Sequence, residues 1–109
     1  MATTYKVLGQ SNPSATTATA LYTVPSTTQA VVSTITVCNQ AAAAATYRVA
    51  VRPDGAVLAA QHYVVYDASL PANATDTLTL GITLGDTDVI TVYASTATMS
   101  FSAFGSELS

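Results

Sequence analysis

The sequence predicts an all-β protein, an antiparallel β-sandwich of about eight short strands, on three observations. Leu78, Leu80, Ile82 and Leu84 alternate with small residues, and a period of two places these aliphatic side chains on one face of a strand. Turn-forming residues recur about every 8–12 residues, and helical periodicity is almost absent. This spacing is typical of jelly-roll and immunoglobulin-like sandwiches, and the sequence does not choose between those two topologies.

The predicted strands follow this alternation along the chain. They cover residues 3–8, 20–24, 29–39, 46–51, 61–67, 78–84, 89–93 and 98–105. Residues 9–18 form a polar loop, and Pro25 ends the second strand because proline cannot donate to a β-ladder. In the third strand the alternation places Val31 on the same face as Ile35 and Val37.

Two connections decide how the strands are arranged. Residues 85–88, Gly-Asp-Thr-Asp, supply a turn, so residues 78–84 and 89–93 are expected to pair as antiparallel neighbours. Their shared aliphatic face then needs a second sheet to cover it. Ala41–Ala45 have high helix propensity, but a helix this short is marginal in isolation. We therefore expect a hairpin connection there, with room for a single helical turn.

The same alternation identifies side chains that leave the core. Tyr47 and Val49 point inward, so Arg48 and Arg52 point outward and are candidate ion-pair donors to a partner. In the last strand Met99, Phe101 and Ala103 are the expected core residues. Phe104 falls on the outward side of that strand, and we expect it to contact a partner.

Charge scarcity is the most informative feature of the composition. Only 8% of the 109 residues are charged, against about 25% in an ordinary soluble domain, and the net charge is −3. A monomer with so few charges is weakly protected against association, so we expect neighbours in an assembly to cover much of the surface. Three basic residues do not make a phosphate-binding footprint, which argues against nucleic acid as a partner.

Other features indicate where the chain is made. No apolar run approaches the roughly 18 residues of a membrane span, and we expect no membrane partner. The first residues lack the basic-then-apolar layout of a secretory signal. Cys38 has no second cysteine to pair with, which fits synthesis in a reducing cytosol.

Residues able to carry chemistry are few, and we expect no catalytic, cofactor or metal site. His62 is the only histidine, expected to be capped by the backbone or a tyrosine hydroxyl, and Cys38 is expected to be a buried, inert thiol. Asp86 and Asp88 fit turn hydrogen bonding better than calcium ligation, which wants about six to eight oxygens. Asn73 opens a glycosylation sequon, which matters only on a secretory route.

The six tyrosines pose one further question. Their aromatic faces are able to form a sugar-binding platform, because aromatic rings stack on the rings of glycans. With no tryptophan and few polar side chains beside them, we expect core and interface packing instead.

Several short motifs resemble a recurring small structural protein of tailed bacteriophages. They are Leu21–Pro25 (LYTVP), Ala30–Ile35 (AVVSTI), Val37–Asn39 (VCN), Tyr47–Pro53 (YRVAVRP), Leu80–Asp86 (LGITLGD) and Phe101–Glu107 (FSAFGSE). The likeness covers most of the chain, but Ala41–Ala45 depart from it, since the pattern favours a more polar connection. The resemblance implies a β-sandwich virion component, such as a capsid cement or decoration protein or a subunit of a tail or fibre. It supplies no catalytic residues.

We therefore expect a non-enzymatic virion protein, made in the host cytoplasm. As a capsid cement or decoration protein it would form a homo-oligomer, a trimer, and clamp the major capsid protein. Residues 1–8 and 105–109 of the single domain 1–109 are candidate interaction arms. The candidate interface residues are Tyr5, Arg48, Arg52, Phe104 and Glu107. The alternatives are a tail, collar or fibre-associated subunit and, from a different class, a carbohydrate-binding adhesion module.

Overall fold

The computed structural model describes residues 2–109 and shows nine strands. The strands are β1 (Thr3–Ser11), β2 (Thr19–Thr23), β3 (Gln29–Asn39), β4 (Ala45–Arg52), β5 (Tyr63–Leu70), β6 (Thr75–Leu78), β7 (Ile82–Leu84), β8 (Val89–Ala94) and β9 (Met99–Leu108). Two single 3₁₀ turns, η1 (Pro53–Gly55) and η2 (Ala60–His62), lie between β4 and β5. The predicted all-β sandwich is confirmed, with nine strands.

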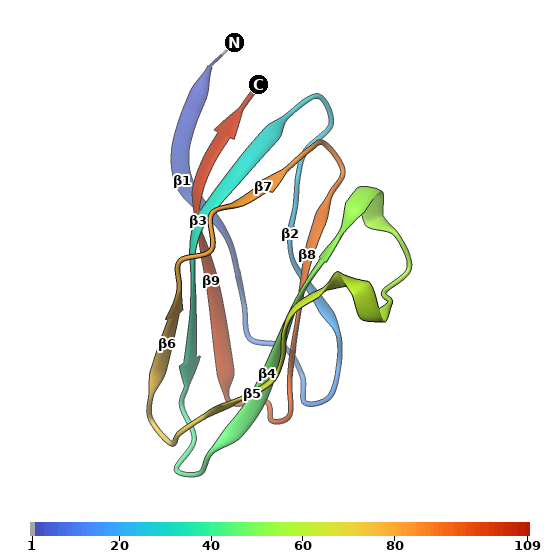
Figure 1. The fold of residues 1–109 in the computed structure, drawn as a ribbon. Coiled ribbons are helices and arrows are strands. Elements are labelled where there is room, and N and C mark those ends of the chain that lie inside the picture. Colours follow the sequence, from blue (N-terminus) through green and yellow to red (C-terminus); the bar gives the residue numbers. More distant parts are fainter. Residues whose placement is uncertain (1) are drawn as a thin grey trace.

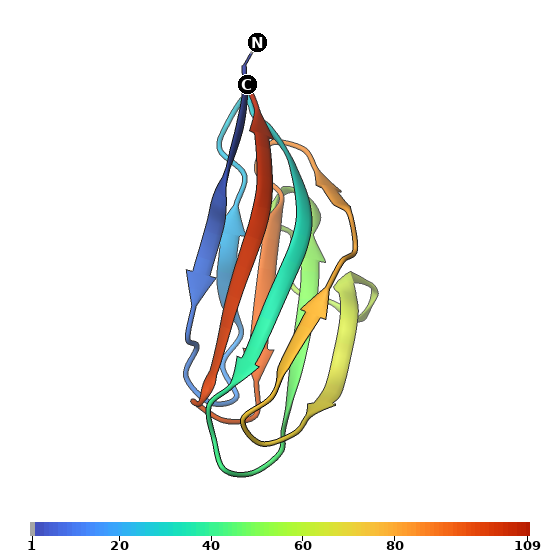
Figure 2. The ribbon, with the colours of Figure 1, turned by 90° about the vertical axis from the view of Figure 1, so that its left-hand side faces the viewer.

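The strands form two antiparallel sheets that pack face to face (Figures 1 and 2). Sheet A has the order β1-β9-β3-β6, and β7 also pairs with β3 beyond the end of β6. Sheet B has the order β2-β8-β4-β5. The two layers give the molecule an elongated shape, with principal extents of 45, 27 and 19 Å.

The pairing is that of one long hairpin wound into a roll. β1 pairs with β9, β2 with β8, β3 with β6 and β7, and β4 with β5, so the pairs are nested around the loop that carries η1 and η2. The contacts of β9 with β3 and of β8 with β4 complete the two sheets. This arrangement is a jelly roll in which the sixth strand is split into β6 and β7. Of the two topologies that the sequence permits, the strand order therefore identifies the jelly roll.

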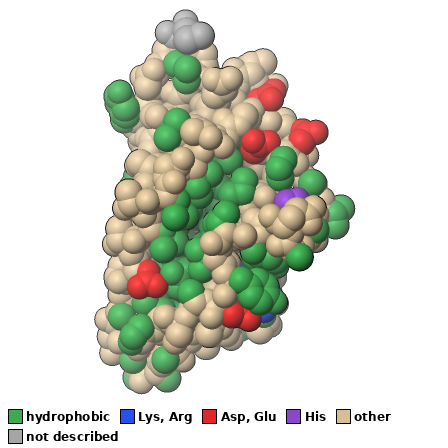
Figure 3. Space-filling model, viewed as in Figure 1, with side chains coloured by type: hydrophobic (Ala, Val, Ile, Leu, Met, Phe, Trp, Pro, Cys, Tyr) green, Lys and Arg blue, Asp and Glu red, His purple; other side chains and the backbone are tan. Residues whose placement is uncertain are grey.

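The core lies between the sheets and is aromatic at its centre. The rings of Tyr47 and Phe101 meet edge to face, with centroids 6.1 Å apart. Met99, Phe101 and Ala103 are fully buried, as predicted from their alternation along β9. In Figure 3 hydrophobic side chains gather along the middle of the molecule, between the edges of the two sheets. Half-buried Leu78 and Ile82 pack against the core from the β6–β7 edge.

A β-bulge makes the prediction for Val31 wrong. The register between β3 and β9 shifts between Val32 and Thr34, so Ser33 is an extra residue in β3. Val32 is therefore buried before the bulge and Ile35 after it, whereas Val31 faces outward and is 43% exposed. Alternation alone cannot detect such a shift, because one added residue reverses every face that follows it.

The predicted strand 78–84 is interrupted. Gly81 has a φ of +62°, a conformation that glycine adopts without a Cβ penalty, and it ends the extended backbone between β6 and β7. Leu80 beside it is 48% exposed, whereas Leu84 is buried in the core. The expectation that Leu80 belongs to a continuous aliphatic face is therefore wrong.

Two expected hairpins are crossings between the sheets. β7 belongs to sheet A and β8 to sheet B, so the turn at residues 85–88 passes from one layer to the other. The connection at residues 40–44 likewise joins β3 of sheet A to β4 of sheet B, without a helix, and Ala45 is the first residue of β4. In both places the second strand reaches the core from the opposite layer, and the alternation of side chains is the same as in a hairpin.

Asn39 holds the second crossing in place, and its side chain is fully buried. Its Nδ2 donates to the carbonyl oxygens of Ala43, Leu70 and Pro71 at 3.0, 3.2 and 3.2 Å. Its Oδ1 accepts from the backbone N–H of Ala41 at 3.1 Å. A buried amide that satisfies its own polar atoms in this way fixes the local path of the chain.

Candidate interaction surfaces

The outer face of sheet A carries no ionic side chain among the residues described. Its outward residues are Thr3, Tyr5, Val7 and Gln10 on β1; Ser100, Ser102, Phe104, Ser106 and Leu108 on β9; Gln29, Val31, Thr34, Thr36 and Cys38 on β3; and Thr75, Thr77 and Thr83 on β6 and β7. We call this surface the uncharged face. Its side chains are hydroxyls, amides, a thiol and hydrocarbons.

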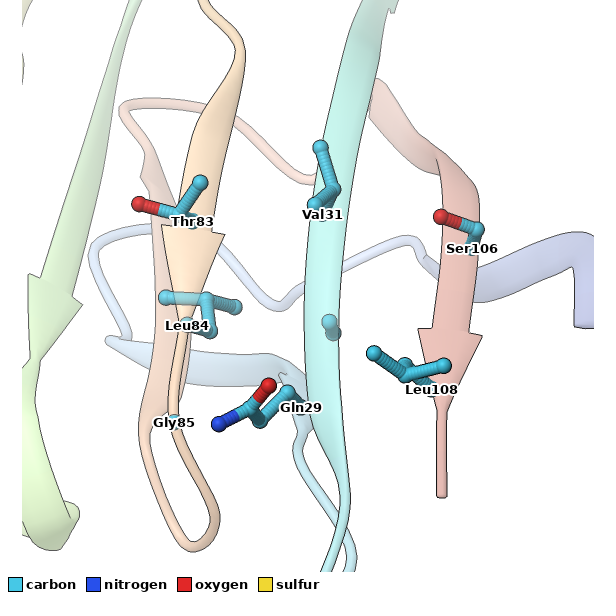
Figure 4. A pocket seen from close by; sticks show the side chains of 8 residues that line it. Gln29, Val31, Thr83, Leu84, Gly85, Ser106 and Leu108 are labelled. Atoms are coloured by element: carbon cyan, nitrogen blue, oxygen red, sulfur yellow. The ribbon is translucent and has the colours of Figure 1, made fainter. Parts of the chain in front are cut away.

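One end of the uncharged face carries its large apolar side chains among small polar ones. Tyr5 lies opposite Ser106, Ser106 opposite Val31, and Val31 opposite Thr83, which makes one row across four strands. Figure 4 shows three of these side chains, on β9, β3 and β7, around a hollow of about 380 Å³. Tyr5 is 83% exposed at the end of the row.

The next rows change in character along the strands. Val7 is paired with Phe104, which continues the apolar end by one row. Further from the termini Ser102 lies opposite Thr36, and Thr36 opposite Thr77. The large apolar side chains of the uncharged face therefore lie near the termini, and the far end of sheet A carries mainly hydroxyls.

The charged residues of β1 and β9 point to the other side of sheet A. Lys6 Nζ lies 3.0 Å from Glu107 Oε1, and the hydroxyl of Tyr22 on β2 donates to Glu107 Oε2. The hydrogen bond from Tyr22, then that from Lys6, holds the pKa of Glu107 below its ordinary value. Burial, then the hydrogen bond to Glu107, raises the pKa of Tyr22. This group links the two sheets and leaves the uncharged face without ions.

The outer face of sheet B carries a different cluster, built around Arg48. The guanidinium Nε and Nη2 donate to the two carboxylate oxygens of Asp67 at 2.6 and 3.2 Å. The guanidinium carbon lies 4.3 Å from the ring centroid of Tyr66 and 4.2 Å from that of Tyr93. The Tyr63 ring meets the Tyr66 ring edge to face, with centroids 4.9 Å apart. We call these five residues the tyrosine–arginine cluster.

Arg48 and Asp67 form an ion pair within the cluster. The hydrogen bond from Arg48 holds the pKa of Asp67 below its ordinary value, and the hydrogen bond to Asp67 raises the pKa of Arg48. Both groups therefore stay ionised and neutralise each other, so the cluster has little net charge.

A hollow of about 620 Å³ adjoins the cluster. Its walls are Leu58, Ala59 and Ala60 of the β4–β5 loop and the rings of Tyr63 and Tyr66. The loop is held by His62, which lies in η2 and not on a strand as predicted, and whose Nδ1 accepts the backbone N–H of Ala59 at 3.0 Å. The expected backbone cap of this histidine is thereby confirmed.

The structure separates the five candidate interface residues. Tyr5 and Phe104 share the uncharged face. Glu107 is turned between the sheets, and Arg48 is paired within its own chain. Arg52 donates to Thr91 Oγ1 at 2.9 Å and to the carbonyl oxygen of Ala56 at 3.1 Å.

The candidate terminal arms are paired with each other. Residues 3–8 of β1 run beside residues 104–108 of β9, with Thr3 opposite Leu108. The backbone N–H of Ala2 donates to the carbonyl oxygen of Ser109 at 2.8 Å, and that of Ser109 to Ala2 at 3.0 Å. Both segments therefore make their backbone pairs within sheet A.

The other side chains considered as possible reactive or binding groups do not form a common site. Cys38 is only half-buried, because it faces outward on β3, so the prediction of a buried thiol is wrong. Both carboxylate oxygens of Asp88 accept backbone N–H groups, from Asp54 and Gly85, each at 2.8 Å, which is the expected turn role. Asn73 lies in an exposed turn. Within residues 2–109 no three His, Cys, Asp or Glu side chains gather as metal ligands would.

No family model, curated protein or solved structure matches the chain. Over the described part of the chain, no helix has the length and apolar character needed to cross a lipid bilayer.

Sequence reasoning missed the tyrosine–arginine cluster. Tyr63 and Tyr66 are three residues apart, a spacing that places side chains on opposite faces of a regular strand. The register between β4 and β5 shifts on both sides of Val49, and Asp67 has a φ of +52°. These irregularities bring the two rings together, and no periodic pattern in the sequence signals them.

Proposed function

We propose that this chain is a non-enzymatic structural protein of a tailed-phage virion, a cement or decoration protein that docks on the major-capsid shell. The observation that carries the proposal is the uncharged face. A sheet face without ionic side chains loses little on desolvation, because no charge has to leave water when a partner covers it. Exposed Tyr5 and Val7 and half-buried Phe104 supply apolar contact.

The size of the uncharged face supports a stable contact. The face is about four strands wide, and β9 along it has 10 residues. At about 3.3 Å per residue and about 4.8 Å between strands it covers roughly 600 Å². This area approaches the roughly 800 Å² that each partner contributes to a standard protein interface. Ordering and association offset much of the gain from burial, and repetition over a shell makes modest contacts collectively strong.

Contacts between copies belong to the sheet edges in this proposal. β1 and β6 end sheet A, and β2 and β5 end sheet B, so the backbone of these strands offers hydrogen-bonding groups to a neighbour. A homo-oligomer, the trimer expected from the sequence, would use these edges and leave the uncharged face for the shell.

Quantitative mass spectrometry of density-gradient-purified phage particles tests the proposal. Several hundred copies per particle are expected for a decoration protein, whereas a dozen or fewer would indicate the tail, collar or fibre alternative. Absence of the chain from particles overturns the proposal.

A pair of variants assigns the contact to the uncharged face. Phe104→Asp puts a charge on it, and we expect the particles to lose the protein. Val57→Asp puts the same charge on the β4–β5 loop, where Val57 is 89% exposed, and we expect it to be retained. Circular dichroism checks that both variants fold. Equal retention of the two variants would contradict docking through this face.

The carbohydrate-binding alternative has its own supporting observation, the tyrosine–arginine cluster. Jelly rolls occur in both viral capsid and lectin domains, so the fold favours neither function. The cluster lies on sheet B and the uncharged face on sheet A, and the two surfaces therefore do not compete for the same residues.

A further inference from the structure

We propose that the hollow beside the tyrosine–arginine cluster binds an uncharged saccharide, with one sugar ring lying against Tyr66. This site is separate from the surface that carries the proposed function, since it lies on the opposite sheet. Its volume of about 620 Å³ falls in the range of roughly 300–1,000 Å³ that small-molecule sites occupy.

The aromatic wall of the hollow is held in place before a ligand arrives. Tyr66 is 60% exposed, yet its ring is fixed by the guanidinium of Arg48 and by the edge of Tyr63, the two rings being inclined at 80°. Arg48 is fixed in turn by its two hydrogen bonds to Asp67. A ring that already makes these contacts needs little rearrangement on binding, which reduces the entropy cost of ordering it.

The charges of the cluster select against ionic ligands. A cationic ligand would seek the space between the faces of Tyr66 and Tyr93, but the guanidinium of Arg48 already occupies it. An anionic ligand would seek the guanidinium edge, but Asp67 already accepts from Nε and Nη2. The net charge of the cluster is therefore small, and the cluster favours an uncharged ligand over an ionic one.

A saccharide also matches the mixture of polar and apolar groups. The C–H faces of a sugar ring can lie on the exposed tyrosine ring, and its hydroxyls can bond to the tyrosine hydroxyls and to the Asp67 carboxylate, 42% of whose side chain is exposed. The side chains of an apolar peptide would cover the same ion pair without offering hydrogen bonds, and burying polar groups unpaired is costly. A saccharide is therefore the ligand that best matches the hollow.

The test is an array of neutral and acidic oligosaccharides, followed by titration calorimetry of the full chain with each hit. We expect saturable binding of at least one neutral oligosaccharide. Tyr66→Ala should weaken that binding by roughly tenfold, the factor that corresponds to about 1.4 kcal/mol, whereas Tyr66→Phe keeps the ring and should stay within about threefold.

Tyr5→Ala is the matched control, because Tyr5 is an exposed tyrosine on the other sheet. This variant should bind the oligosaccharide as tightly as the parent chain does. No neutral hit, hits confined to acidic glycans, binding of apolar peptides alone, or equal weakening by Tyr5→Ala and Tyr66→Ala would each overturn the inference. None of these outcomes affects the particle measurements, so the proposed virion function stands or falls separately.

Discussion

Glu107 shows at the scale of one residue how this chain uses its few charges. It lies on β9, in the middle of sheet A, and it accepts from Tyr22 on β2 of sheet B while it pairs with Lys6 on β1. A carboxylate shared by two donors stays ionised more readily than it does in the unfolded chain. The residue therefore ties the terminal strands to the opposite layer.

This arrangement predicts how stability responds to acid. The pKa of Glu107 is lower in the folded chain than its ordinary value of 4.5. The ionised carboxylate therefore contributes fully to the free energy of unfolding above pH 4.5, and this contribution is lost as the pH falls through the lowered pKa. We expect Glu107→Gln to flatten the fall of unfolding free energy below about pH 5. Urea denaturation at a series of pH values measures this.

Tyr22→Phe refines the same measurement. It keeps the ring and removes the hydroxyl that donates to Glu107. We expect acid to lower the free energy of unfolding of Tyr22→Phe less than that of the parent chain and more than that of Glu107→Gln, because Lys6 still pairs with the carboxylate. An acid profile that is identical in all three proteins would show that Glu107 is not the responsible group.

At the scale of the element, alternation predicts regular strands and fails at bulges. The inward residues of β9 follow from the sequence, because Met99, Phe101 and Ala103 keep a period of two. The bounds of β3 are also those predicted, residues 29–39. The sequence does not predict that Val31 points outward or that the rings of Tyr63 and Tyr66 meet, because each depends on an added residue in one strand. Both candidate interaction surfaces contain such a bulge, so their composition could not be predicted in full.

Gly105 is the partner of the β3 bulge and gives a second prediction. A Cβ at this position would overlap the carbonyl oxygen of Val31, a backbone atom that cannot move aside without shifting the strand. We expect Gly105→Ala to lower the free energy of unfolding by at least about 2 kcal/mol, as overpacking against a fixed backbone does. Thermal or urea denaturation followed by circular dichroism measures the change.

Gly85→Ala is the control for this substitution. A Cβ at Gly85 would meet only Asp88 Oδ2 at 3.7 Å, which is an ordinary van der Waals contact. We expect a change within about 0.5 kcal/mol, the usual range for a surface substitution. If Gly105→Ala is tolerated as well as Gly85→Ala, the close approach of β9 to β3 is not a requirement of the fold.

At the scale of the whole molecule the nested pairing joins the two ends of the chain. Thr3 lies opposite Leu108, and every inner pair of the long hairpin is nested inside this one. The sandwich class could be predicted from local patterns, but the strand order could not. Crossings and hairpins present the same alternation, as the turns before β4 and β8 show, and only long-range pairing separates them.

The pairing of the ends predicts the effect of shortening the chain. Deleting residues 105–109 removes the β9 partners of residues 3–6 in β1 and of residues 29–32 in β3, so we expect a lower thermal midpoint and loss of the cooperative transition. Segments that acted only as arms toward a partner could be removed without this loss. Scanning calorimetry of the truncated chain decides between the two roles.

An extension provides the matched control for the truncation. Adding five glycine and serine residues after Ser109 changes the length of the chain but leaves every pair of β9 in place, so the thermal midpoint should stay that of the parent. A truncated chain that unfolds like the extended one would show that the β1–β9 pairing contributes little.

The two termini emerge side by side at one pole of the molecule (Figure 1), where Ala2 and Ser109 exchange backbone hydrogen bonds. A few linking residues can therefore close the backbone into a ring without disturbing either sheet. For the same reason, a passenger protein genetically joined to either terminus is attached at the same pole of the molecule.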